Sequence, residues 1–401
     1  MRICLFTPSF LPELGGMEIV IDRLARQFKD MGHEAVVIAQ KPRHINFTAD
    51  DRSDYAENTE KDLIKKNSAC SAVSAVRMPL DVPYDVVYYP RPRSAVWLLG
   101  SVKRLLLNEH QRHRFDIIHA HMAYPTGFIA AKLKHRLNIP VVITSHKGDI
   151  VPESRYRQRF ITRRRLCWAM KNADAVTGVS EKLKDIIDEL TQGQAKSLTI
   201  SNGVDMPDDS PGAMPEACRS LADRPFMLTL GRLHQYKGLD VLLDAMAILK
   251  KQDVTIPCLV IAGEGKELDN LQKQVQKLNL DSLVFFTGAV FGLQKHWLLR
   301  NCEFFLQPSR AEGMPLTVLE AFAYGKPVIG TKISGIEELV TPGKTGYLVE
   351  SDDSRSLAGA ILEASTNSAI GKMGAEARRF ASTRTWPVIA AKYIDLFSGL
   401  R

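Results

Sequence analysis

The chain has 401 residues, of which 45% are hydrophobic and 24% are charged, a balance typical of globular proteins that excludes wholesale disorder. This length is about two to three times that of a typical domain, so we expect two lobes with separate cores. The six cysteines stand singly without a CxxC pair, which argues against a zinc site and against a disulfide framework.

The net charge of +8 comes entirely from the first half of the chain. Residues 1–205 hold 31 Lys and Arg against 23 Asp and Glu, whereas residues 206–401 hold 22 of each. We therefore expect an anionic partner for the first half. No apolar run reaches the length of a membrane span, and the first residues, MRICLFTPSF, lack the features of a signal peptide. We interpret them as a first strand and expect a cytoplasmic protein.

Short apolar runs alternate with amphipathic stretches along the chain, as in parallel strands joined by helices. Runs of Val, Ile, Leu and Phe without polar alternation indicate strands that are buried on both faces. The predicted strands are ICLFTPS, AVVIAQ, DIIHAH, VVITSH, AVTGVS and LTISNG, then FMLTLGR, CLVIAGEG, VFFTG, FFLQPS, PVIGT and GYLV. The fold class is thus α/β, with two Rossmann-like, doubly wound lobes.

The lobes are assigned to residues 1–205 and 206–384, because the stretch 206–225 is rich in proline and acid and has no periodicity. Residues 42–72 form a polar excursion from the first lobe. Residues 385–401 predict a final helix with apolar residues along one face.

Polar residues and glycines stand where the predicted strands end, which is where open parallel sheets bind ligands. We therefore expect one cleft lined by the ends of both sheets. The histidines of DIIHAH alternate, and we interpret them as pointing to opposite faces, with His121 at the site and His119 in packing. Gly15 and Gly16 follow the first strand and form either a turn or a ligand loop. The other strand-end residues are Ser9, His146, Ser180, Asn202, Arg232, Glu264, Gly288 and Ser309, and Asp149 lines the same edge.

The segment SRAEGMPLTVLEAFAYGKPVIG predicts a loop and then a short helix that begins near Pro315. Glu312 lies in the loop and Glu320 inside the helix. Free backbone N–H groups over 314–317 suit phosphate or sugar oxygens. The spacing alone leaves open that Glu312 is a capping carboxylate and Glu320 a solvated one.

Residues 155–171 hold seven basic and no acidic residues, interleaved with aromatic and aliphatic side chains. Such a helix suits an anionic membrane surface, which the amphipathic stretch 97–110 could share. A merely solvated helix remains the alternative, and no nucleic-acid-binding motif accompanies the arginines.

Several of these segments, in order along nearly the whole chain, resemble the retaining family-4 glycosyltransferases of GT-B fold (glycosyl transferases group 1). The segments are TPSFLPELGGMEIVIDRLARQFKDMGHEAVVIA, DIIHAHMAYPTG, TSHKGD, SNGVD, GRLHQYKGLDVLLDA, AGEGKELDNLQ and EGMPLTVLEAFAYGKPVIG. The resemblance implies two Rossmann-like lobes and a final helix that crosses back to the first.

The resemblance also implies roles for the site residues. Arg232 and Lys237 would grip the donor diphosphate in place of a metal, so no metal and no cofactor are expected. His121 would lie beside the donor sugar, Glu312 would reach the sugar hydroxyls and Glu320 the ribose. The remaining donor-side residues are Gly15, Gly16, Glu264, Gly288, Gly313, Met314, Pro315 and Leu316, and those on the acceptor side or in the cleft are His146, Asp149, Ser180 and Asn202.

The partners implied are a nucleotide-sugar donor and a glycan or lipid-linked acceptor for cell-envelope synthesis, with no nucleic acid. Two other classes remain open from the residues. A sugar phosphorylase or a nucleotide-sugar epimerase uses the same lobes, and a non-catalytic nucleotide- or carbohydrate-binding protein would share the fold. The donor base, the sugar and the acceptor are not determined by the sequence.

Overall fold

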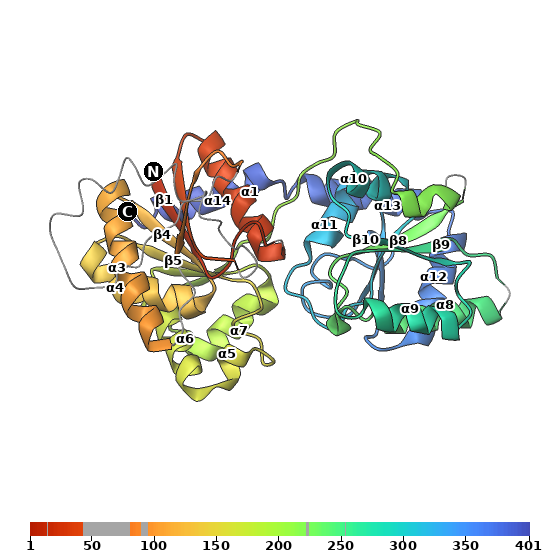
Figure 1. Ribbon diagram of the computed structural model, residues 1–401, viewed down its shortest axis with the longest axis horizontal. Helices are drawn as coiled ribbons and strands as arrows, with labels where there is room; N and C mark the ends of the chain where they lie inside the picture. The colour runs from red at the N-terminus through yellow and green to blue at the C-terminus, as the bar shows by residue number, and fades with distance from the viewer. Residues whose placement is uncertain (14, 43–80, 90–94, 222–223, 253) are drawn as a thin grey trace, which may run out of the picture. The chain divides into compact units, whose positions relative to one another are not determined.

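The computed structural model describes residues 1–13, 15–42, 81–89, 95–221, 224–252 and 254–401, so nearly all of the polar excursion at 42–72 lies outside the described residues. The chain divides into two compact units (Figure 1). Unit 1 comprises Met1–Thr177, Ile187–Ser197 and Ile394–Arg401, and unit 2 comprises Gly178–Ile186 and Leu198–Tyr393. In the part of the chain that the structure describes, no helix is long and apolar enough to span a membrane.

Unit 1 contains most of a seven-stranded sheet with the order β3-β2-β1-β4-β5-β6-β7. The central strands are buried along nearly their whole length, which explains their continuous apolar sequence. The sequence analysis did not predict β3, a short run bounded by Pro83 and Pro90. The strands are β1 (Arg2–Thr7), β2 (Glu34–Gln40), β3 (Asp85–Tyr89), β4 (Ile117–His121), β5 (Val141–Ser145), β6 (Ala175–Gly178) and β7 (Ser197–Thr199).

The helices that follow these strands are amphipathic, as the periodicity indicates. Helix α1, for example, buries Val20, Ile21, Leu24, Ala25 and Phe28. The helices are α1 (Gly16–Asp30), α3 (Ala95–His113), η2 (Ala123–Gly127), α4 (Phe128–Leu137), α5 (Arg155–Gln158), α6 (Phe160–Asn172) and α7 (Glu181–Thr191).

The single basic helix predicted over 155–171 is wrong, because the structure divides it into α5 and α6. Arg159 between them has extended backbone angles (φ −88°, ψ 123°). The Thr162 hydroxyl donates to the carbonyls of Tyr156 (2.6 Å) and Arg159 (3.0 Å). It thereby satisfies backbone oxygens that a continuous helix would have paired internally.

Unit 2 contains a six-stranded sheet with the order β10-β9-β8-β11-β12-β13. Figure 1 shows α8, α9 and α12 on one face of this sheet and α10, α11 and α13 on the other. The strands are β8 (Phe226–Leu230), β9 (Cys258–Ala262), β10 (Val284–Gly288), β11 (Phe305–Gln307), β12 (Val328–Thr331) and β13 (Gly346–Val349). The helices are η3 (Glu216–Leu221), η4 (Gln235–Lys237), α8 (Leu239–Lys251), α9 (Leu268–Lys277), α10 (Gly292–Asn301), α11 (Leu316–Ala323), α12 (Ser354–Thr366) and α13 (Ile370–Ser382).

The last helix, α14 (Trp386–Ser398), has its residues up to Tyr393 in unit 2 and the rest in unit 1. Its apolar face is buried at Trp386, Ile389, Tyr393 and Phe397. In unit 1 the Phe397 ring packs on Phe28, with centroids 5.9 Å apart. The predicted fold class of two doubly wound α/β lobes is confirmed by the two parallel sheets.

Candidate functional site

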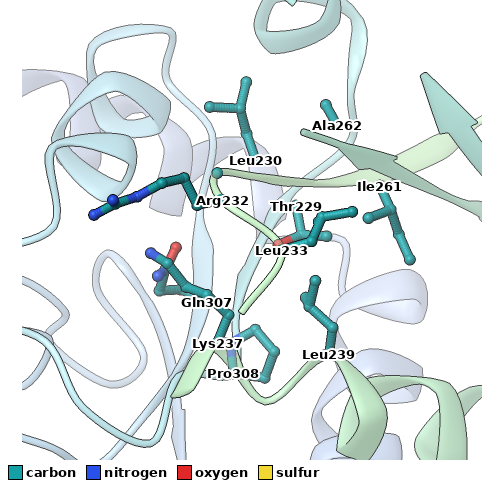
Figure 2. Close-up of a pocket in the computed structure, with 11 residues that line it drawn as sticks. Thr229, Leu230, Arg232, Leu233, Lys237, Leu239, Ile261, Ala262, Gln307 and Pro308 are labelled. Carbon is teal, nitrogen blue, oxygen red and sulfur yellow. The ribbon is translucent and has the colours of Figure 1, made fainter. Parts of the chain in front are cut away.

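Both sheets reverse their strand order beside their first strand, between β1 and β4 and between β8 and β11. At such a point the connections leave in opposite directions, which opens a crevice beyond the carboxyl ends of the strands. In unit 2 a pocket lies at this point (Figure 2). It is lined by Thr229, Leu230, Gly231, Arg232, Leu233, Lys237, Leu239, Ile261, Ala262, Gln307 and Pro308.

The loops at this edge of unit 2 are joined through their backbones. The N–H of Gly231 donates to the carbonyl of Ala262 (2.9 Å), and the N–H of Gly263 donates to that of Gly288 (2.8 Å). Gly263 has φ +147°, and a Cβ added there would lie 1.9 Å from the carbonyl oxygen of Gly231. Only glycine allows this approach, so the loop that carries Arg232 has a fixed position relative to β9 and β10.

Lys237 and Glu312 form an ion pair at the pocket, with Nζ and Oε1 2.7 Å apart and side-chain exposures of 15% and 11%. The same carboxylate oxygen accepts hydrogen bonds from Gln307 Nε2 and Ser309 Oγ, each at 2.9 Å. A charge pair this far removed from water needs such additional donors to offset the loss of hydration. The loop residue Glu312, 75 positions from Lys237 in the chain, is therefore held at one defined place.

Arg232 is exposed, and no hydrogen bond or ion pair to it is found among the residues that the structure describes. Figure 2 shows its side chain extending away from the apolar side chains of Leu239 and Ile261. It follows β8 directly, whereas Lys237 ends the short helix η4 that precedes α8. Both cations line the pocket and give it positive charge that suits an anion.

The predicted short helix exists as α11, with Glu312 in the loop before it and Glu320 inside it. Pro315 stands at its N-cap position without a side-chain cap, so backbone N–H groups of the first turn have no capping side chain. Gly313 and Met314 are buried. A Cβ on Gly335 would lie 2.2 Å from the carbonyl oxygen of Gly313, so a second glycine keeps this loop closely packed.

Glu320 forms an ion pair with Lys295 of α10, with Oε1 and Nζ 2.6 Å apart. Helix α10 is itself tied to α11, because Tyr324 OH lies 2.8 Å from Nδ1 of His296. Sequence reasoning missed Lys295, and no sequence signal relates it to Glu320. It also missed Gln307, whose signal is a polar residue within an otherwise apolar strand.

Glu264 follows β9, and Gly288 is the last residue of β10, at the same edge of the sheet. The Glu264 carbonyl accepts from the N–H of Leu233 (2.8 Å), while its side chain is exposed. Gly288 has φ +69°, a conformation that favours glycine. The structure therefore brings these two predicted residues into the group of loops that carries Arg232.

Asn202 and Ser180 are also held within unit 2. Asn202 Nδ2 donates to the carbonyl of Met314 (3.1 Å), which supports the loop before α11. Ser180 is fully buried, and its hydroxyl accepts from the N–H of Leu183 (3.3 Å), as an N-cap does. The described contacts of Asn202 and Ser180 thus support a loop and a helix end within unit 2.

In unit 1, the prediction that His119 and His121 point to opposite faces is wrong. Residues two apart in a strand lie on the same face, and the two rings have centroids 4.3 Å apart. His119 Nε2 lies 2.7 Å from Thr144 Oγ1, and its ring contacts Phe397 of α14. His121 Nδ1 lies 2.8 Å from Nε2 of His146. The three histidines therefore form one cluster on one face of the sheet.

Asp149 lies beside this cluster and is fully buried. Its Oδ2 accepts from the N–H of Ala123 (2.5 Å) and from Ser145 Oγ (3.2 Å). Burial raises the pKa of Asp149 to about 6, although these hydrogen bonds oppose the rise. His121 Nε2 and Asp149 Oδ1 are buried without a hydrogen-bond partner among the described residues. They are polar atoms with unused hydrogen-bonding capacity at the end of β4.

Gly15 and Gly16 precede and begin α1. A Cβ on Gly15 would lie 2.5 Å from Glu18 Oε2, whereas nothing lies within 4 Å of one on Gly16. The Glu18 carboxylate also accepts from the Ser9 hydroxyl at the end of β1. Gly15 therefore leaves room for a carboxylate that links the first strand to the first helix.

The histidine cluster predicts acid sensitivity. Burial, and then the charge of His146, lower the pKa of His119 to about 3. A histidine with a lowered folded pKa contributes stability that is present above its unfolded pKa and is lost as the pH falls. Between about pH 6.5 and about pH 4.5, this one residue should remove about 2 to 3 kcal/mol from the free energy of unfolding.

Urea unfolding across this range checks the expectation, with His119→Gln flattening the pH dependence and the exposed His135→Gln leaving it unchanged. An equal pH slope in wild type and His119→Gln would contradict it.

No group of three or more His, Cys, Asp and Glu that could hold a metal ion is found in the described ranges. The chemistry that the unit 2 site itself offers is anion binding, by Arg232, Lys237 and the first turn of α11, next to two carboxylates able to accept hydrogen bonds from hydroxyls.

Comparison with known proteins adds sequence evidence. The model of Glycosyltransferase Family 4 matches residues 14–207, and that of Glycosyl transferases group 1 matches residues 215–382. An uncharacterized glycosyltransferase of Methanocaldococcus jannaschii is 27% identical over 94% of this chain and 92% of its own length. An alpha-monoglucosyldiacylglycerol synthase of Streptococcus pneumoniae is 24% identical over 91% of this chain and 78% of its own length. The crystal structure of HepE from Anabaena in complex with UDP matches with a TM-score of 0.75 at 20% identity, covering all of both chains.

Proposed function

The chain belongs to the group 1 glycosyltransferases of GT-B fold, and we propose that it moves a sugar from a nucleoside diphosphate sugar to an acceptor hydroxyl with retained configuration. The observation that carries the proposal is the pairing of Lys237 with Glu312 at the reversal point of the second sheet, beside the exposed Arg232. In such a donor, the cations suit the diphosphate and the carboxylate suits the hydroxyls of the sugar.

In this proposal Arg232 and Lys237 bind the diphosphate, and the first turn of α11, over Gly313, Met314, Pro315 and Leu316, adds backbone donors. Glu312 accepts hydrogen bonds from the sugar hydroxyls. Glu320 accepts them from the ribose, and Glu264 and Gly288 lie beside the nucleoside. The UDP in the HepE complex supports a nucleoside diphosphate as the common element of the donor.

The reaction breaks the bond between the sugar C1 and the diphosphate oxygen and forms a bond from C1 to the acceptor oxygen on the same face. The acceptor proton passes to an oxygen of the departing phosphate. Breaking the bond to C1 leaves negative charge on the diphosphate, and in this proposal Arg232 and Lys237 stabilise it where it develops. His121, with its buried and unused Nε2, is assigned to the sugar side. His146 lies 2.8 Å from its Nδ1, and Gly15, Gly16 and Asp149 belong to the same unit.

The proposal is tested by a thermal-shift screen of the purified chain against UDP, GDP, ADP and their sugars. A ligand at 100 times its dissociation constant stabilises the folded state by about 2.7 kcal/mol. One nucleotide family should raise the melting temperature, and acceptor-dependent release of that nucleoside diphosphate should follow. No shift with any of them would contradict a nucleotide-sugar donor.

Transfer should not require a divalent metal, because two protein cations are assigned to the charge that a metal neutralises elsewhere. Full activity is expected in the presence of EDTA. Loss of transfer on chelation and its return with magnesium or manganese would refute the roles given to Arg232 and Lys237.

The acceptor in this proposal is a glycan or lipid-linked precursor of the cell envelope, and the enzyme works in the cytoplasm at the inner face of the cell membrane. The name of the pneumococcal relative, a synthase of alpha-monoglucosyldiacylglycerol, supports a lipid as acceptor. A phosphorylase would instead need inorganic phosphate, and an epimerase would act without any acceptor.

A further inference from the structure

Two large apolar side chains stand exposed where α6 begins. Phe160 is 72% and Ile161 63% exposed. Arg155, Arg159, Arg163 and Arg164, around them in the chain, are also exposed, and no acidic residue occurs between Ser154 and Asn172. We call these six residues the basic-apolar patch. Phe160, Arg163 and Arg164 lie three and four positions apart on one helix and so share a face.

Other basic residues in and near this segment have side chains that contact the rest of unit 1. Arg157 bonds to the carbonyl of Ile150 and to Glu189, and Arg165 lies 5.6 Å from the ring of Phe128. Trp168 is covered by Lys132, whose Nζ lies 4.0 Å from the ring centroid. Among the patch arginines, Arg164 lies 5.6 Å from the centroid of the Phe160 ring. Arg155 lies 4.9 Å from that of Tyr156 and donates to its hydroxyl (2.9 Å). Within 155–171, the exposed basic residues are thus Arg155, Arg159, Arg163 and Arg164.

We propose that the basic-apolar patch docks the enzyme on a bilayer containing anionic lipid. The arginines meet the headgroups, while Phe160 and Ile161 enter the boundary between headgroups and acyl chains. Cations near such a surface and apolar side chains below it contribute independently to binding. The pair of apolar residues favours a bilayer over a polynucleotide, because a phosphate backbone offers no apolar layer for an aliphatic side chain such as Ile161. This partner deepens the proposed function, since it brings the enzyme to a lipid-linked acceptor.

The test is flotation of the full chain with vesicles of phosphatidylcholine, with and without phosphatidylglycerol, at low and high salt. Wild type should bind only the anionic vesicles. Arg159→Gln/Arg163→Gln/Arg164→Gln should weaken that binding by about a hundredfold at low salt, given about fivefold per cation. Phe160→Ser/Ile161→Ser should weaken it by at least about tenfold, and its remaining binding should disappear at high salt.

Matched controls are available in unit 2. Phe291 and Leu293 are 62% and 60% exposed, and Lys266, Lys273 and Lys277 are exposed on and beside α9. Phe291→Ser/Leu293→Ser and Lys266→Gln/Lys273→Gln/Lys277→Gln should bind vesicles as wild type does. Equal binding by wild type and both patch variants, or equal losses in the controls, would overturn the inference. So would loss of polynucleotide binding without loss of vesicle binding.

The nucleotide thermal shift, measured on the same proteins, separates this inference from the proposed function. Both patch variants should keep the wild-type shift, which also shows that they are folded. A wild type that shifts with nucleotide and ignores anionic vesicles overturns the docking surface alone. A wild type that binds the vesicles and gives no nucleotide shift overturns the proposed donor alone.

Discussion

Glu312→Gln should lower turnover by about 10²- to 10³-fold while the affinity for the free nucleoside diphosphate is retained or improved. A carboxylate that holds the sugar acts on the transition state, and losses of this size are typical when one such group is removed. The structure adds the reason for improved affinity. Glu312 pairs with Lys237 at 2.7 Å, so removing its charge frees the ammonium to meet a phosphate.

Glu320→Gln is the matched comparison, because it makes the same chemical change inside α11, whereas Glu312 lies in the loop before this helix. Binding of the free nucleoside diphosphate should weaken by about 1.5 to 3 kcal/mol if a charged hydrogen bond to the ribose is lost. Calorimetric titration of the nucleotide into both variants measures the difference. Affinity lost in Glu312→Gln and kept in Glu320→Gln would show that the roles are reversed.

Lys237→Met and Arg232→Met should both lower turnover by about 10²- to 10³-fold, since each removes one cation from the leaving diphosphate. Their effects on stability should differ. Lys237→Met leaves the Glu312 carboxylate largely buried without its partner, which typically costs about 3 to 5 kcal/mol. Arg232 is exposed and has no described partner, so its loss should change the free energy of unfolding by less than about 0.5 kcal/mol.

Chemical denaturation and single-turnover kinetics on the same preparations separate the two effects. Lys332→Met is the control, because Lys332 pairs with Glu350 on the surface with both side chains about half exposed or more; its loss should affect neither quantity. Equal stability of Lys237→Met and Arg232→Met would contradict the expected cost of breaking the ion pair of Lys237 with Glu312. Full turnover in either variant would show that the replaced cation has no part in the mechanism.

Much of this structure could be predicted because its signals are local. Twelve apolar runs were predicted as strands, and a strand of the structure overlaps each of them. Pro315 and Gly325 likewise bracket α11, since proline suits the start of a helix and glycine its end. The spacing that places Glu312 in a loop and Glu320 in a helix is also local.

The remaining features depend on contacts between distant segments. Lys295 and Glu320 are 25 residues apart, and nothing in either segment relates them. The break at Arg159 depends on where the Thr162 hydroxyl finds carbonyl oxygens. The assignment of His119 and His121 to opposite faces failed for a simpler reason, because a strand repeats every two residues.

In unit 2, hydrogen bonds between backbone groups join Gly231 to Ala262 and Gly263 to Gly288. These bonds use no side chain of the loops that they join. Main-chain hydrogen bonds join the turn that carries Arg232 to the loops after β9 and β10, and no hydrogen bond of the Glu264 side chain is found among the described residues. Under the proposed function, an exchange at this outward-facing position would alter which nucleobase is preferred without moving the cation assigned to the phosphates.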